Sequence, residues 1–119
     1  MRLLLTTCVL IGALGFWTTA QAEQIQVKSM KIWNLTAATI TDLRLAPAGK
    51  ATFGRNLVLD DKDGEINIDE RLTLKDVAPG DYDVTVALSN KRHCKVQGLK
   101  LEDGQIVSIE EKDLRDCSR

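Results

Sequence analysis

The most site-like part of the chain is an acidic turn, Asp61-Lys62-Asp63-Gly64-Glu65-Ile66, which is followed by Glu70. With Gly64 at the sixth position of a calcium-binding hand, Asp61, Asp63 and Glu70 fall on the third, fifth and twelfth positions, where that loop expects acidic ligands. The first position is Leu59, which has no side-chain oxygen, and both flanks resemble strands rather than helices. The turn is therefore a weak calcium candidate. The alternative is a β-turn with solvated carboxylates.

The thiol and imidazole groups offer little chemistry. Cys94 and Cys117 are separated by 22 residues, which is too wide a spacing for a C-x-x-C redox pair. The alternatives are a disulfide or free thiols that bind a metal. His93 precedes Cys94, but neighbouring residues of a strand point to opposite faces and rarely share a metal. A single histidine is also too few for a transition-metal site. We therefore predict no metal at His93 and a disulfide between Cys94 and Cys117.

Composition and motifs argue against several function classes. Lys plus Arg number 16 and Asp plus Glu number 17, well mixed along the chain, and aromatic residues make up only 4%. Such a chain lacks the basic patch and stacking platform of nucleic-acid-binding proteins. The sequence also contains no G-x-S-x-G, H-E-x-x-H, P-loop or three-glycine fingerprint. We expect no enzymatic activity, no cofactor and no nucleic-acid partner.

One loop combines an aromatic residue with cations. Residues 47–56 hold Lys50, Phe53 and Arg55 among small residues. Aromatic and cationic side chains often anchor protein interfaces, which makes these three the candidate binding residues. The alternative is a structural crossover in which Phe53 fills the end of the fold.

The N-terminal residues have the organisation of a cleaved signal peptide. Arg2 precedes an apolar stretch over residues 3–17, and Ala20 and Ala22 form an A-x-A cleavage site. A membrane-spanning helix needs ~20 apolar residues, and this stretch is shorter. Cys8 lacks the preceding small residue of a lipoprotein. We predict a signal peptide over residues 1–22, a periplasmic or secreted domain over residues 23–119, and no membrane anchor after cleavage.

Apolar residues in the rest of the chain mostly alternate with polar ones, which is the period of half-buried β-strands. Alternation changes phase near Asp42, which predicts a β-bulge, and again at Gly98. Asp103-Gly104 predicts a tight hairpin turn. About seven short strands at this spacing predict an all-β fold, a small antiparallel β-sandwich of the Ig-like or prealbumin-like kind. An incomplete barrel is the alternative. The runs cover residues 25–33, 40–45, 57–59, 66–74, 82–88, 94–101 and 107–109.

Register constrains the predicted disulfide. If Asp103-Gly104 is a two-residue hairpin turn, Cys94 lies opposite Asp113 and Cys117 lies beyond the ladder. The two Cα atoms of a disulfide must lie within ~7 Å. We therefore expect the tail after Glu111 to leave the sheet, form one helical turn and return to the strand that contains Cys94.

Two resemblances add to this pattern. Residues 72–86, LTLKDVAPGDYDVTV, resemble the strand–PG turn–strand hairpin of prealbumin-like and carboxypeptidase-regulatory-like sandwich domains. That resemblance implies a sandwich, commonly a non-catalytic module. Most of the predicted mature chain is similar to a family of small secreted bacterial proteins of unknown function. Phe53 stands where that family usually has tryptophan, and residues 60–69 resemble an insertion. The similar pieces are Asn34-Leu35-Thr36 (also a glycosylation sequon, relevant only in a eukaryotic source), 46–49, 53–57, 82–84 and 113–117.

These observations favour a non-enzymatic secreted or periplasmic module that recognises an envelope protein or a glycan through its loops. A second hypothesis is an inhibitor of a secreted hydrolase, which would insert a loop into an enzyme cleft, or a small hydrolase itself.

Signal-peptide cleavage can be checked on exported protein. Because signal peptidase accepts small residues at Ala20 and Ala22, the mature chain should begin at Glu23. Intact-mass spectrometry of the exported protein measures this directly. A mass that retains residues 1–22 would contradict the signal-peptide prediction.

Overall fold

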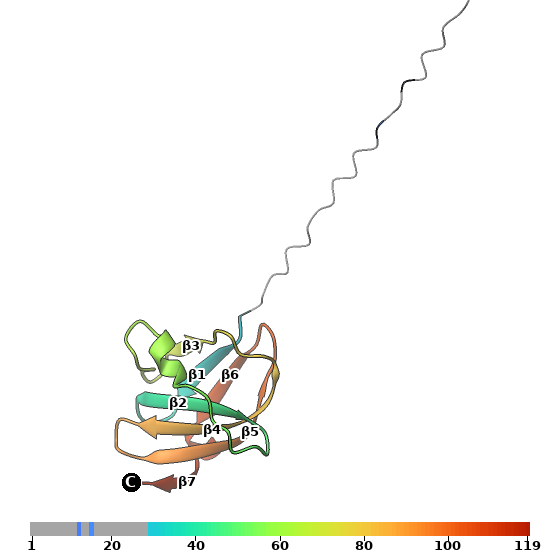
Figure 1. The fold of residues 1–119 in the computed structure, drawn as a ribbon. Coiled ribbons are helices and arrows are strands. Elements are labelled where there is room, and N and C mark those ends of the chain that lie inside the picture. Colours follow the sequence, from blue (N-terminus) through green and yellow to red (C-terminus); the bar gives the residue numbers. More distant parts are fainter. Residues whose placement is uncertain (1–11, 13–14, 16–28) are drawn as a thin grey trace, which may run out of the picture.

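The computed structural model describes Gly12, Gly15 and residues 29–119. The remainder of the predicted signal peptide, its cleavage site and the apolar alternation at Ile25 and Val27 lie outside the described residues. The described part is an all-β sandwich in which two sheets pack face to face (Figure 1). This confirms the predicted fold class.

The two sheets contain seven strands. The three-stranded sheet has the order β3 (Arg71–Thr73), β1 (Lys31–Leu35) and β6 (Ile106–Glu110). The four-stranded sheet has the order β2 (Ile40–Pro47), β4 (Gly80–Leu88), β5 (His93–Leu101) and β7 (Arg115–Ser118). The sandwich is not purely antiparallel, because β1 and β6 pair in parallel.

The core between the sheets is aliphatic. Strand residues that alternate inward, such as Ile32, Val84, Val86 and Ile109, are at most 2% exposed. Tyr82 only packs against the edge of this cluster. Burial of branched aliphatic side chains from both sheets supplies the main stabilisation, since each contributes about 1.5–3 kcal/mol when removed from water.

Several predicted strands differ from the structure. Residues 57–60 form a 3₁₀ turn, η1 (Leu57–Asp60), because the Asn56 side chain accepts a hydrogen bond from the Val58 N–H. In the predicted run over residues 66–74, only residues 71–73 form a strand, β3. Ile66 makes an isolated β-bridge to Ile40, and Ile68 is 55% exposed. Local apolar alternation is too short there to distinguish a strand from a turn.

Two predicted hairpins are connections between sheets. Asp103-Gly104 turns the chain from β5 in one sheet to β6 in the other, so it does not join paired strands. The Pro79-Gly80 turn similarly leads from the sheet of β3 to the sheet of β4. In each case the turn itself is present, but the following strand finds its ladder partner elsewhere in the chain; β6 pairs with β1.

Both predicted phase changes are register shifts. One lies between Ile40 and Asp42, which confirms the bulge on β2. The other places Asp83 opposite the extra residue of β5, between the pairs Tyr82–Leu99 and Val84–Val96. Gly98 has a φ of +67° there, which glycine adopts without steric cost.

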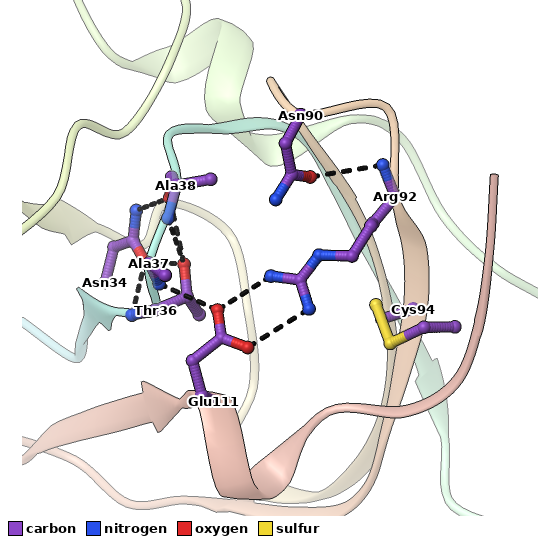
Figure 2. Close-up of polar contacts among 9 residues, drawn as sticks. Asn34, Thr36, Ala37, Ala38, Asn90, Arg92, Cys94 and Glu111 are labelled. Atoms are coloured by element: carbon purple, nitrogen blue, oxygen red, sulfur yellow. Dashed lines mark hydrogen bonds and ion pairs between the residues drawn. A yellow bond between two sulfur atoms is a disulfide. The ribbon is translucent and has the colours of Figure 1, made fainter.

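The C-terminal tail leaves the sheet of β6 and returns to the strand that contains Cys94, as predicted from the register. After β6 the chain forms the 3₁₀ turn η2 (Glu111–Asp113), and β7 then pairs antiparallel with β5. Cys94 and Cys117 form a disulfide with a Cα–Cα distance of 4.1 Å (Figure 2). The tail is therefore a true edge strand rather than a coil, and the predicted pairing of the cysteines is confirmed.

Loss of the disulfide should destabilise the fold. All residues of β7 are exposed, so the cross-link is its main attachment to β5. Cys94→Ser with Cys117→Ser should lower the free energy of unfolding by about 2–4 kcal/mol, or the melting temperature by roughly 10 °C or more. Thermal unfolding monitored by circular dichroism measures this.

The control is Ser118→Ala, which should unfold like the wild type because this neighbour is not cross-linked. Wild-type protein reduced with dithiothreitol should follow the double variant, which separates the bond from the cost of a hydroxyl at buried Cys94. Two free thiols in oxidised, folded protein would overturn the assignment.

Candidate functional site

Two of the three predicted binding residues line a hollow on the outer face of the four-stranded sheet. We call it the sheet-face hollow; its volume is about 270 Å³. Lys50 and Phe53 come from the loop after β2, and β4 and β5 supply the residues from Asp83 onward. The lining residues are Gly49, Lys50, Ala51, Phe53, Asp83, Val84, Lys95, Val96 and Gln97.

Asp83 holds the loop wall in place. Its Oδ2 accepts a hydrogen bond from the Gly49 N–H at 3.0 Å, and its Oδ1 accepts one from the Gly98 N–H at 3.2 Å. Further along, the Gly54 N–H donates to the Leu45 carbonyl at 2.9 Å. The loop is thus attached to β2 and β4, and the same Asp83 carboxylate ties β5 to this region, so the hollow is formed without a ligand.

Phe53 does not fill the end of the sandwich. Its side chain is 38% exposed and lies outside the buried core cluster. The structural alternative for this residue is therefore wrong, because the ring lines the outer face of the sheet rather than the space between the sheets.

Arg55 is separated from Lys50 and Phe53. Its guanidinium forms a two-point ion pair with Asp60, at 2.8 and 2.7 Å, and lines a different cavity beside Tyr82. The hydrogen bond from Arg55 holds the pKa of the Asp60 carboxyl below its usual value. Arg55 therefore holds η1 in place, a structural use for a residue predicted to bind a partner.

The outer face continues beyond Lys95 into a second depression. It is lined by residues of β2, β4, β5 and β7, among them Arg44, His93 and Asp116. His93 is exposed, whereas Cys94 is 2% exposed and points into the core, as expected of neighbours on a strand. Within residues 29–119, no hydrogen bond joins His93 to a serine, so no nucleophile–base pair is assembled there.

The acidic turn brings together the three carboxylates that the sequence singled out. Ligand oxygens of Asp61, Asp63 and Glu70 all lie within 4.8 Å of one another. The Asp63 N–H donates to Asp61 Oδ2, and the Asn67 N–H donates to Glu70 Oε2, so the two carboxylates also stabilise the turn. Leu59, at the first loop position, is 71% exposed and supplies no side-chain ligand.

The outer face of the three-stranded sheet holds a cluster that the sequence analysis missed. Trp33 alternates with buried Ile32 and Asn34, so it points outward. Its indole Nε1–H donates to Asp69 Oδ1 at 2.9 Å, and the Arg71 guanidinium lies 4.5 Å from the ring centroid. The alternation of buried and half-buried residues along β1 was the available signal.

The Arg92–Glu111 pair anchors the C-terminal turn (Figure 2). Glu111 accepts two hydrogen bonds from Arg92, at 2.7 and 3.1 Å, and one from the Ala37 N–H at 2.8 Å. Arg92 and the Ala37 N–H lower the pKa of Glu111 below its usual 4.5. A lowered carboxyl pKa stabilises the fold above that value, and the stabilisation is lost as the pH falls through the folded-state pKa.

Asn34 is not a glycosylation site in this fold. Its side chain is fully buried, and its amide donates to the carbonyls of Ala38 and Ile66, each at 2.9 Å. A glycan on this nitrogen would replace one donor and require space that the core does not have.

Comparisons of the chain with protein-family models, curated proteins and solved structures found no match. Over residues 29–119, the structure contains no helix long and apolar enough to cross a membrane.

Calcium should bind the acidic turn weakly or not at all. Three carboxylates with Leu59 at the first position provide too few oxygen ligands for a sensor-type loop, whose affinity lies near 10⁻⁷–10⁻⁵ M. Isothermal titration with CaCl₂ should show no binding in that range, and Asp63→Asn should behave like the wild type. Micromolar binding that Asp63→Asn abolishes would contradict this expectation.

Proposed function

We propose that the protein is a non-enzymatic secreted or periplasmic binding module that recognises an envelope protein or a glycan through the sheet-face hollow. The observation that carries the proposal is the convergence of Lys50 and Phe53, from a loop, with Lys95, from β5, on one preformed hollow. An aromatic ring beside two cations is a common interface anchor.

Preorganisation supports a binding role. Asp83 fixes the loop at Gly49 and the β5 bulge at Gly98, so little conformational entropy is lost when a partner binds. The Phe53 ring supplies apolar area, and the polar groups of Asp83, Lys95 and Gln97 supply hydrogen-bonding specificity.

Two observations support location outside the cytoplasm. The Cys94–Cys117 disulfide is compatible with an oxidising compartment, where such bonds persist. The N-terminal sequence has the pattern of a cleaved signal peptide, and the sandwich begins after it.

The inhibitor alternative has less support from the loop geometry. An inhibitory loop projects into the cleft of an enzyme, whereas this loop lies against the sheet through the Gly54–Leu45 hydrogen bond. The hydrolase alternative would need a base beside a nucleophile, and His93, the single histidine, lines the second depression without such a contact within the described residues.

The test is retention from a native envelope fraction on immobilised protein, with eluates analysed for both proteins and saccharides. Phe53→Ala and Lys50→Ala should each reduce retention of the specific partner at least tenfold, because each truncates a side chain that lines the hollow. Leu59→Ala is the matched control, since it truncates a side chain that is 71% exposed and lies outside the hollow.

Equal retention by wild type, Phe53→Ala and Leu59→Ala would contradict the assignment of the sheet-face hollow as the binding site. Turnover of a hydrolase substrate by the wild type that His93→Ala abolishes would favour the hydrolase alternative instead.

A further inference from the structure

We propose that the outer face of the three-stranded sheet is a second binding site, which takes a carboxylate-bearing saccharide. In this site Arg71 binds the carboxylate, and Trp33 and Lys31 position the ligand around it. The site lies on a different sheet from the sheet-face hollow, so it extends the proposed function and does not rest on it.

Strand register places the relevant side chains next to one another. Trp33 lies in the centre of the sheet, with Arg71 opposite it on β3 and Ser108 opposite it on β6. One step along the same face, Lys31 lies between Thr73 and Ile106. The face is therefore a small grid with an indole at its centre, two cations beside it and hydroxyl groups on both flanks.

Arg71 is held in position but its hydrogen-bonding capacity is unused. Its guanidinium lies 4.5 Å from the Trp33 ring centroid, within the range of a cation–π interaction. The five N–H donors of this side chain form no hydrogen bond or ion pair with the described residues. A guanidinium over an aromatic ring keeps its N–H donors available, and their planar fork matches a carboxylate in a two-point pair.

The indole is itself fixed by a hydrogen bond, so its orientation does not depend on a ligand. Trp33 Nε1–H donates to Asp69 Oδ1, and the Asp69 N–H donates to the Asn34 carbonyl at 2.7 Å. Asp69 has a φ of +68°, a left-handed conformation that costs free energy for a non-glycine residue. The residue in this costly conformation is the one whose carboxylate fixes the orientation of the Trp33 ring.

Charge selects an anionic ligand. Lys31, Arg71 and Lys112 lie on or beside this face, against Asp69 and Glu110. Both carboxylates are engaged, Asp69 by the indole and Glu110 by Lys112 at 3.2 Å. Lys31 and Arg71 form no ion pair with the described residues, so an incoming carboxylate is the charge they lack.

The remaining surface favours a sugar over a peptide. Half-buried Leu35 and 48%-exposed Ile106 offer apolar area, and Thr73 and Ser108 offer hydroxyl groups. A pyranose ring presents the same alternation of C–H faces and hydroxyls. An acidic peptide would instead use strand edges and deeper pockets, and it serves as the competing outcome of the test.

The experiment uses processed protein, in which Trp33 is the single tryptophan and its fluorescence reports on this face; Trp17 lies in the predicted signal peptide. The probes are trigalacturonate, neutral maltotriose and hexaglutamate, titrated at low and at physiological salt. Trigalacturonate should change Trp33 emission and bind more weakly as salt rises, whereas maltotriose should bind at least tenfold more weakly.

Arg71→Gln should reduce trigalacturonate affinity at least tenfold, and Arg71→Lys should not restore it, because the planar fork is lost. Arg115→Gln, a matched change at an exposed arginine of β7, should bind like the wild type. Phe53→Ala should also bind like the wild type, so this result is separable from that for the sheet-face hollow.

The proposal is overturned if trigalacturonate and maltotriose bind equally, if neither binds, or if Arg71→Gln leaves trigalacturonate binding unchanged. Tighter binding of hexaglutamate than of trigalacturonate would reassign the face to an acidic protein partner.

Discussion

The buried amide of Asn34 is the polar contact on which one end of the sandwich depends. Its nitrogen donates to the carbonyls of Ala38 and Ile66, and its Oδ1 accepts from the N–H and hydroxyl of Thr36 at 3.0 and 2.7 Å. It thereby supplies partners for backbone groups in the turn after β1 and in the segment before β3. An unpaired buried polar group costs about 1–3 kcal/mol, so no apolar residue can replace this amide without leaving several such groups exposed to the core.

Both outer surfaces of the molecule are connected to this contact. The Asn34 backbone bonds to Asp69 and Glu70, at 2.7 and 2.9 Å, which places Asp69 within hydrogen-bonding distance of the indole N–H and Glu70 in the acidic turn. On the other side, the Ala37 N–H donates to Glu111, which holds Arg92 and the start of the C-terminal tail. The buried network therefore positions surface groups through short backbone segments, without a long flexible loop.

The sequence alone was sufficient to predict the features that depend on residues close together in the chain. Alternation gave the inward residues of β4 and β5, a phase change at Gly98 gave the bulge, and the distance limit of a disulfide gave the turn after Glu111. Calcium-loop spacing even identified three carboxylates that converge. Each of these results depends on residues close in sequence or on a covalent constraint.

The sequence alone was insufficient to predict strand pairings and side-chain contacts between residues that are far apart in the chain. The sheet to which a strand belongs is decided by ladder partners, so the turns at Pro79-Gly80 and Asp103-Gly104 looked like hairpins but connect different sheets. The same limit applied to the site: nothing local shows that Trp33 and Arg71 face each other across two strands.

The parallel pairing of β1 with β6 has a consequence for how the chain acquires its structure. Strand β1 pairs with residues 71–73 and 106–110. Its sheet therefore cannot form completely until nearly the whole chain has emerged from the ribosome. Pairings this distant in sequence form slowly, since the loop between them must close first. The three-stranded sheet is therefore completed late in synthesis, only after residues 106–110 of β6 are available to pair with β1.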